Sequence, residues 1–479
     1  MCSKIGLFPN KSTYTQGDAM QQIVTEIASV ENQINLFFHN HSLGKLLRQC
    51  NIRKEKGVPL ESLFQFLLGL AFTGKNLFRH MEPSGSCDGI FKDAAYRFQN
   101  SVRANWRRFL LLLSTRIIVN SLEPMTDESN IKVLIADDTL FLRDRSKHVE
   151  LLARVHDHNT GLYHKGFRML TMGWSDGSSF IPILLSLLSS AKEKNRLVPM
   201  RDDLDKRTNG YKRRQESTRT SPDVLVDMVS LAMNAGIKAR HLLFDSWFAF
   251  PVTIRKIHAL GMHTVCILKD TPKIYYTFED KQVTLKELFK LLRKRPGRAK
   301  VLASCMVTIG NDDNGKPVPA KIVFVRDRSS KSWLALLSTD TTLAGEAIIK
   351  LYKRRWDIET FFKIAKSFLK LATECQSRSY DAMIAHATLV CCRYLILEIG
   401  KRTTADPRTL GTLFYATCDE IRQASFIEAL ALLFRLLEQT LEAVVGFSKE
   451  QIERLVRQFI EHLPPVFRRR LLLLAPANV

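Results

Sequence analysis

The spacing of apolar residues changes near residue 131, and this change constrains the fold most strongly. Upstream the spacing is helical, whereas downstream short apolar runs with a strand pattern alternate with helical segments. The predicted strands cover residues 131–136, 167–174, 180–187, 240–244 and 264–268. Ser175-Asp176-Gly177-Ser178 is typical of a hairpin turn, and glycines stop the helices predicted over 223–234 and 251–260. This order predicts an α/β fold whose mixed sheet begins with three antiparallel strands.

The segments on either side of this core have other patterns. Residues 271–341 alternate like strands around Asn311–Gly315, and residues 343–371 have the pattern of one long helix. We therefore expect a helical region over 1–125, the first part of the core over 126–270, a β-rich insertion over 271–341, a helix completing the core over 342–378, and a helical C-terminal region over 379–479. The basic N-terminal region has the character either of a DNA-binding helix pair or of an ordinary helical bundle.

The positive charge of the chain is concentrated in a few segments. The sequence has 71 Lys and Arg against 48 Asp and Glu, a net charge of +23. Most of the excess lies in 206–220, 286–300 and 350–370, whereas an evenly solvated surface would mix both signs. Such clusters are typical of proteins that bind nucleic acid through its phosphates. We expect the first run to be a loop or helix end that contacts DNA through Lys212, Arg213 and Arg214.

The cysteines and the apolar segments indicate in which cellular compartment the protein is expected. The nine cysteines include no Cys-x-x-Cys pair, and Cys391 and Cys392 are neighbours on a predicted helix. This usage favours reduced thiols in a cytosolic protein without a zinc ribbon. The longest apolar stretch, 385–399, contains Arg393, and the N-terminus soon becomes polar. We therefore expect neither a membrane span nor a signal peptide.

Two aspartates follow predicted core strands. Asp137 closes the first strand and Asp245 the fourth, so their carboxylates are expected at one edge of the sheet. With a third acid from a nearby helix, they would form a site for two divalent cations about 4 Å apart. Oxygen ligands favour Mg²⁺ or Mn²⁺ over Zn²⁺. The alternative is that each aspartate forms a turn or caps a helix.

The predicted helix over 343–371 has one polar stripe. At 100° per residue its polar members fall within an arc of about 80°. The stripe consists of Tyr352, Arg355, Glu359, Lys363 and Lys366. Two interpretations remain open: a solvated face with i, i+4 salt bridges, or a metal-binding glutamate among cations that bind phosphate.

The spacing of this stripe resembles a known signature. Tyr352, Arg355, Glu359 and Lys366 match the Y-R-E-K pattern of one large group of bacterial DDE transposases, the insertion-sequence family four. The segments 134–139 and 243–248 also resemble the two aspartate blocks of that group. The resemblance covers residues 130–370 and implies a ribonuclease-H-like fold.

The resemblance also implies roles for individual residues. Asp137, Asp245 and Glu359 would bind two Mg²⁺ or Mn²⁺ ions. Asp137 and Asp138 point to opposite sides of a strand, so only one is the ligand, and the family pattern favours Asp137. Tyr352, Arg355 and Lys366 would contact the transposon end, with Lys363 in the same stripe but outside the signature.

Trp333 precedes the catalytic helix by 19 residues. It resembles a family tryptophan that holds a base flipped out of the duplex. An ordinary core tryptophan on a strand is the equally weighted alternative.

The activity implied by the resemblance is DNA transposition. The protein would cut the terminal inverted repeats of an element by two-metal hydrolysis and join them to target DNA by transesterification. A homodimer would pair two DNA ends in the cytoplasm of a bacterium, at the nucleoid. Two other functions remain open: a ribonuclease-H-like nuclease that does not join DNA, and a non-catalytic DNA-binding regulator.

Overall fold

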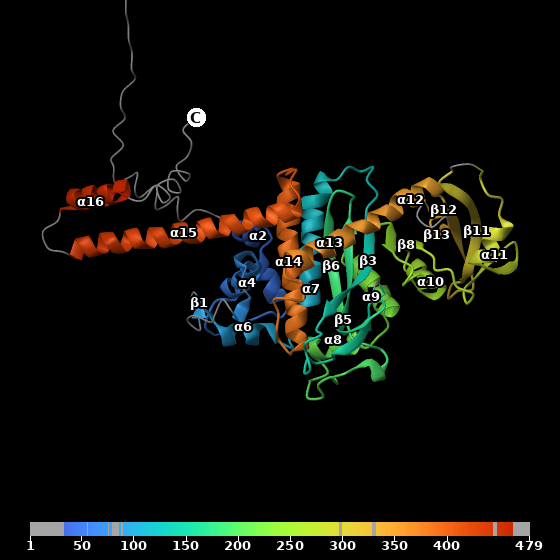
Figure 1. Cartoon of the computed structure of the whole chain (residues 1–479), viewed down its shortest axis with the longest axis horizontal. Helices are drawn as coiled ribbons and strands as arrows, with labels where there is room; N and C mark the ends of the chain where they lie inside the picture. The colour runs from blue at the N-terminus through green and yellow to red at the C-terminus, as the bar shows by residue number, and fades with distance from the viewer. Residues whose placement is uncertain are drawn as a thin grey trace, which may run out of the picture. The chain divides into compact units, whose positions relative to one another are not determined.

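The computed structural model describes residues 33–462 apart from 55, 75, 79–85, 88–89, 159, 297–298, 328–331 and 444–447 (Figure 1). The chain divides into two compact units. The larger unit comprises residues 37–414 and contains every residue that we predicted to take part in catalysis or DNA binding. The smaller unit combines the segment before residue 37 with the segment after residue 414.

A mixed sheet of 11 strands forms the centre of the larger unit. Its strands are β3 (Val133–Leu142), β4 (Ala153–His156), β5 (Tyr163–Ser175), β6 (Phe180–Leu188), β7 (His241–Phe244), β8 (His263–Ile267), β9 (Tyr275–Phe278), β10 (Lys281–Thr284), β11 (Val301–Asn311), β12 (Pro317–Arg326) and β13 (Trp333–Ser338). Their order is β10-β9-β11-β12-β13-β8-β7-β3-β5-β4, and β6 pairs with β5 outside this path. Strands β3, β5 and β6 are antiparallel neighbours, whereas β7 and β8 run parallel to β3.

The predicted insertion belongs to the same sheet. Strand β13 pairs with β8 through Leu336–Ile267 and Leu337–Cys266, so β9–β13 extend the core sheet instead of forming a separate layer. The alternation of apolar residues predicted β11, β12 and β13. It did not predict that β13 pairs with β8, about 70 residues earlier in the sequence. In Figure 1 these strands lie on the side of β8 away from β3 and β5.

Helices cover the sheet. Helix α7 (Trp106–Ile117) and helix α14 (Tyr380–Thr403) pack on β6, and α9 (Ser221–Asn234) packs on β5 and β6. Helix α10 (Pro251–Ala259) lies against β8 and β11. The helix pair α7 and α14 thus ties the N-terminal region and the predicted C-terminal region into one core with the sheet.

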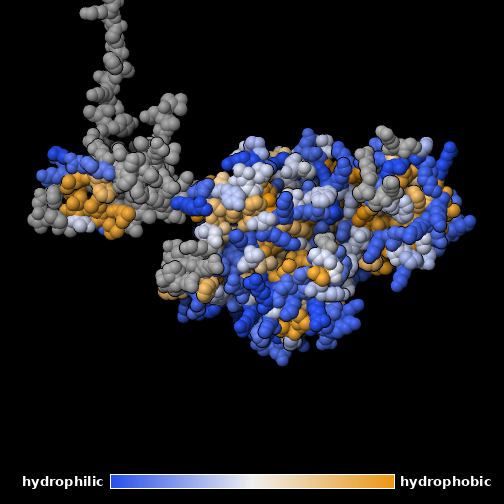
Figure 2. Space-filling view, in the orientation of Figure 1, coloured by the Kyte–Doolittle hydropathy of each residue, from blue (hydrophilic) through white to orange (hydrophobic). Residues whose placement is uncertain are grey.

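Helix α14 is the one long apolar helix of this kind in the described part of the chain. It is long and apolar enough to cross a membrane by length and composition, but its apolar window is completely buried inside the protein. Arg393, at its centre, forms an ion pair with Glu374 at 2.5 Å and donates to the carbonyl of Leu68. These contacts make α14 a core helix of the larger unit, although we had assigned it to a C-terminal region starting at residue 379. Figure 2 shows a largely hydrophilic face of the larger unit with smaller hydrophobic patches.

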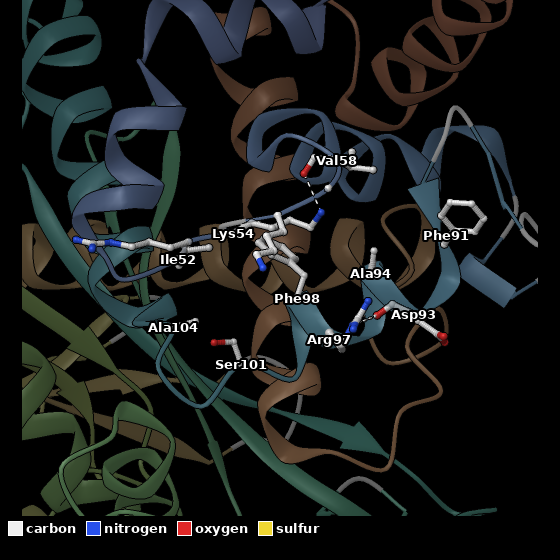
Figure 3. Close-up of a pocket in the computed structure, with 13 residues that line it drawn as sticks. Ile52, Lys54, Val58, Phe91, Asp93, Ala94, Arg97, Phe98, Ser101 and Ala104 are labelled. Atoms are coloured by element: carbon white, nitrogen blue, oxygen red, sulfur yellow. Dashed lines mark hydrogen bonds between the residues drawn. The ribbon is translucent and has the colours of Figure 1, made fainter.

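The N-terminal segment of the larger unit is helical, as the sequence predicted. Its other helices are α2 (Gln33–Asn40), α3 (Leu43–Gln49), α4 (Leu60–Gly69) and α6 (Lys92–Gln99), with a small ribbon of β1 (Ser86–Cys87) and β2 (Ile90–Phe91). Phe64, Trp106 and Phe109 pack together in its core. A cavity of about 700 Å³ opens between these elements, with Lys54 and Arg97 in its lining (Figure 3). The residues before Gln33 lie outside the described part of the chain.

The predicted long helix over 343–371 is interrupted. The structure has α12 (Gly345–Tyr352), a 3₁₀ turn over Lys353–Arg355 and α13 (Trp356–Ser367). Arg354 of this turn donates to the carbonyls of Ile131 and Asp176, which lie beside the start of β3 and in the β5–β6 turn. A 3₁₀ turn has about 3.0 residues per turn, so the side chains before and after it are offset from an ideal α-helical stripe.

Candidate active site

The register of β3 and β7 places Asp137 and Asp245 side by side across the two neighbouring strands. Strands β3 and β7 are parallel neighbours, and Ile135 pairs with Leu243, so each aspartate follows two residues after that pair. We had expected β3 to end at Asp137, but it continues to Leu142 because its second half pairs with β5. Since β7 stops at Phe244, Asp137 lies just where the neighbouring strand ends. Adjacent strands are about 4.8 Å apart, so the two carboxylates are close neighbours.

Arg355 connects Asp137 to the predicted glutamate. Its guanidinium forms an ion pair with Asp137 at 3.0 Å and a second ion pair with Glu359, four residues later on α13. The guanidinium also lies 5.8 Å from the ring centre of Tyr352. The structure therefore brings Tyr352, Arg355 and Glu359 of the resembled signature to Asp137.

The site disfavours negative charge on Asp137. Burial, and next to it the Asp245 carboxylate, raise the pKa of Asp137 to about 7, although the positive charge of Arg355 acts in the opposite direction. Burial likewise raises the pKa of Tyr352, against the influence of Arg355. Buried carboxyl groups whose pKa lies near neutrality are common where proteins bind cations or transfer protons.

Asp138 has different partners from Asp137. Its Oδ1 accepts from Arg168 on β5 at 2.6 Å, whereas its Oδ2 is buried and accepts no hydrogen bond from the described residues. Burial raises the pKa of Asp138, and Arg168 lowers it. Asp137 shares Arg355 with Glu359, whereas Asp138 does not. The geometry therefore favours Asp137 over Asp138 as the carboxylate that acts together with Asp245 and Glu359.

The donor groups suit a divalent cation of the magnesium type. Asp137, Asp245 and Glu359 offer only carboxylate oxygens, which are hard ligands. Among the described residues, no group of three or more His, Cys, Asp or Glu side chains is close enough together to hold a metal ion. Arg355 forms ion pairs with both Asp137 and Glu359, so its positive charge occupies two of the three carboxylates. The donor set fits the cation, provided that Arg355 releases these carboxylates.

The comparison with known families agrees with this site. A family model of DDE superfamily endonucleases matches residues 87–285. The matched segment contains Asp137 and Asp245 and ends before Glu359. The match supports a DDE transposase-like relationship, and with it a metal-dependent nuclease or transposase role. No curated protein matches the chain.

The two lysines of the stripe lie on α13. Lys363 and Lys366 are both exposed to solvent. Partial desolvation lowers the pKa of Lys366, and the nearby carboxylate of Asp157 opposes this shift. Lys366 is therefore close to the loop that precedes β5, and both lysines are available to an external anion.

Trp333 is packed inside the predicted insertion. It begins β13, is half-buried and lies with its ring centre 5.0 Å from that of Phe289 and 5.1 Å from that of Phe324. These contacts favour the interpretation of Trp333 as a core residue of the strand. Its role in holding a flipped base stays a prediction.

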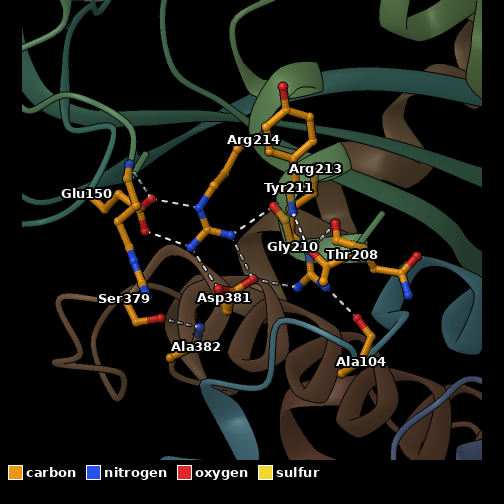
Figure 4. Close-up of polar contacts among 12 residues, drawn as sticks. Ala104, Glu150, Thr208, Gly210, Tyr211, Arg213, Arg214, Ser379, Asp381 and Ala382 are labelled. Atoms are coloured by element: carbon orange, nitrogen blue, oxygen red, sulfur yellow. Dashed lines mark hydrogen bonds and ion pairs between the residues drawn. The ribbon is translucent and has the colours of Figure 1, made fainter. Parts of the chain in front are cut away.

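The structure disfavours the DNA contacts predicted for Arg213 and Arg214, because both side chains are engaged within the protein (Figure 4). Both residues lie within α8 (Asn209–Ser217), where we had expected a loop or the end of a helix. The Arg214 side chain is 0% exposed and forms ion pairs with Glu150 at 2.6 Å and Asp381 at 2.7 Å. Arg213 is largely buried, forms an ion pair with Asp381 at 3.2 Å and donates to the carbonyl of Ala104. Only Lys212 of the three is exposed, and its contact with DNA stays a prediction.

The sequence interpretation overlooked residues that surround the aspartates. Arg168 pairs with Asp138, and its guanidinium lies 5.7 Å from the ring centre of Trp247. Trp247 is 41% exposed. Its position two residues after Asp245 was the signal that could have indicated a role in the site.

Proposed function

We propose that this protein is a metal-dependent DDE transposase that cuts DNA and joins the cut ends to a target. The observation that carries the proposal is the level placement of Asp137 and Asp245 on β3 and β7, with Glu359 linked to Asp137 through Arg355. The match to DDE superfamily endonucleases over residues 87–285 supports the nuclease part of the proposal.

The carboxylates are the proposed cation ligands. Asp137, Asp245 and Glu359 would hold two Mg²⁺ or Mn²⁺ ions, which supply activation of the attacking oxygen and neutralisation of charge on the phosphate. Arg355 balances the carboxylates before cations bind and then becomes free to donate two parallel hydrogen bonds to a DNA phosphate. The DNA strand is positioned along α13 by Tyr352, Lys363 and Lys366.

The remaining parts of the proposal concern partners. The substrates are the terminal inverted repeats of an insertion element and target DNA, and the positive charge of +23 supports binding to both. We propose a homodimer that pairs two ends, with helices of the C-terminal region in the contact. Helix α16 (Lys449–His462) has one hydrophobic side and one hydrophilic side (Figure 2). The protein would act at the bacterial nucleoid, in the cytoplasm.

The substitution Glu359→Gln tests the assignment directly. It removes one negative charge without changing the size of the side chain, so we expect cleavage of DNA in Mg²⁺ to be lost while the affinity for duplex DNA changes little. Cleavage products are measured on gels and affinity by fluorescence anisotropy. Glu346→Gln, an exposed glutamate on α12, is the matched control and should cleave normally. Cleavage by Glu359→Gln at the wild-type rate would refute the proposal.

A nuclease that does not join DNA is the second candidate, because the matched family is described as endonucleases. A pre-cut DNA end separates the two functions. Joining of this end to a target plasmid in Mg²⁺ supports a transposase, whereas cleavage without joining supports a nuclease. Binding with neither reaction would favour a DNA-binding regulator.

A further inference from the structure

A strip of aromatic rings runs along the surface toward Asp245. The ring centre of Tyr163 lies 4.9 Å from that of His156, His156 lies 4.8 Å from His158, and His158 lies 5.2 Å from Trp247. Tyr163 and His156 come from the facing ends of β5 and β4, and His158 comes from the loop between these strands. The β4–β5 hairpin and the segment after β7, which carries Trp247, thus build one continuous set of rings.

This strip is anchored to the carboxylates of the candidate active site. The backbone N–H of Trp247 donates to Oδ1 of Asp245 at 2.9 Å. Arg168 lies near the indole of Trp247 while its guanidinium is paired with Asp138. The position of the Trp247 ring is therefore coupled to the two strands that carry the aspartates.

The rings at both ends of the strip are open to solvent. Trp247 is 41% exposed and Tyr163 is 72% exposed, and the neighbouring Leu162 is 60% exposed. A single exposed apolar side chain is ordinary on a protein surface, but a contiguous group beside a polar site is typical of a binding surface. Ring faces that stay exposed in this way offer area for stacking.

Cations surround the strip. Lys269 is exposed, follows β8 and is close enough to His158 for its charge to lower the pKa of that imidazole, although burial is the largest cause of the shift. Lys366 approaches the same loop at Asp157. A ligand with a flat apolar group and a negative charge would match these rings and lysines together.

We propose that Trp247, His158 and Tyr163 form a stacking surface for an unpaired base of the DNA strand that enters the Asp137–Asp245–Glu359 site. The inference builds on the proposed function and adds a binding site for a nucleobase to it. Phosphates of the same strand lie at Lys269 and Lys366, and stacking accepts any base because every base has a flat face. Trp333 is less suited to this role because Phe289 and Phe324 pack against its ring.

The experiment uses the full-length protein and a DNA duplex with a short unpaired overhang, in buffer without divalent metal. A fluorescent adenine analogue in the overhang reports stacking by a loss of its emission. We expect wild-type protein and Trp247→Phe to quench the probe, and Trp247→Ala to leave it bright and to bind the overhang duplex roughly tenfold more weakly. Affinity for a blunt duplex should stay the same in all three proteins.

Tyr275→Ala provides the matched control. Tyr275 is an exposed aromatic residue on β9, which lies toward the opposite end of the strand order from β5, and its loss should not affect quenching. Unchanged thermal unfolding of Trp247→Ala establishes that its fold is intact. Full quenching by a folded Trp247→Ala protein overturns the inference and leaves the proposed function standing. Failure of wild-type protein to bind even the blunt duplex overturns both.

Discussion

Individual residues of the site carry charges that oppose the stability of the fold. Asp137 is held among protein atoms beside a second carboxylate, and its neutral form is favoured until the pH reaches about 7. The positive charge of Arg355 favours the charged form of Asp137. Two neighbouring carboxylates lower the stability of the folded state, and such pairs are common where a protein binds a cation.

We predict that Asp137→Asn stabilises the metal-free protein at alkaline pH. The folded-state pKa of Asp137 is about 7 against an ordinary value of 3.8, so the native state holds this proton more tightly than the unfolded chain. Wild-type stability therefore falls as the pH rises from about 4 to about 7, and the penalty is complete above that range. Asparagine removes this penalty because it carries no charge. The free energy of unfolding should therefore rise by up to about 4 kcal/mol at pH 8, and the difference should disappear near pH 4. Thermal unfolding in a chelator measures this difference. An equal loss of stability at every pH would contradict the prediction.

We predict that Arg355→Gln increases the affinity of the free protein for Mn²⁺. The guanidinium competes with a cation for Asp137 and Glu359, and its removal frees both carboxylates. One charge-assisted hydrogen bond is worth about 1.5 kcal/mol, so we expect roughly tenfold tighter binding at alkaline pH. Isothermal titration calorimetry without DNA provides the measurement. Lys363→Gln, exposed on the same helix, is the control, and weaker binding by Arg355→Gln than by this control would show that Arg355 supports the cation site.

Elements differ in how far their sequence reveals their role. Helix α8 is strongly basic, yet Arg214 neutralises Glu150 and Asp381, which lie 64 and 167 residues away along the chain. The charge run was visible in the sequence, but its partners were brought together only by folding. The start of helix α13 shows the opposite case, because the ion pair between Arg355, just before the helix, and Glu359 is local and has i, i+4 spacing.

We predict that Arg214→Met destabilises the protein without changing its affinity for duplex DNA. Methionine leaves the buried carboxylates of Glu150 and Asp381 without their shared cation, which costs about 3–5 kcal/mol. Chemical unfolding monitored by circular dichroism measures the loss. Lys212→Met, at the exposed neighbouring position, should leave stability unchanged. A fully stable Arg214→Met protein that binds DNA poorly would restore the original expectation that this arginine binds DNA.

At the scale of the whole molecule, one sheet links distant parts of the sequence. The order of strands joins the predicted insertion to the aspartate strands through β8 and β13, and α14 covers β6 from the C-terminal side of the sequence. The larger unit of residues 37–414 therefore forms one compact body around the candidate site.

We predict a steep salt dependence for the binding of duplex DNA by the intact protein. A chain with a net charge of +23 that neutralises several phosphates releases the counterions bound to them. Affinity should fall by about 10³-fold or more when salt rises from about 50 to 200 mM, as measured by anisotropy. A nearly flat dependence would indicate that the excess charge serves another partner.

The sequence alone determined most of the local elements and predicted which acidic residues form the site. Apolar periodicity located β5, β6, β7, β8 and β13 to within a few residues, and the spacing of Tyr352, Arg355 and Glu359 indicated a functional helix. Only the tertiary structure decided that Arg213 and Arg214 are buried, that β9–β13 extend the core sheet and that Trp247 lies beside Arg168 and His158. The physical reason is that periodicity and helical spacing are set by neighbours along the chain, whereas burial and ion pairing depend on residues that only folding brings together.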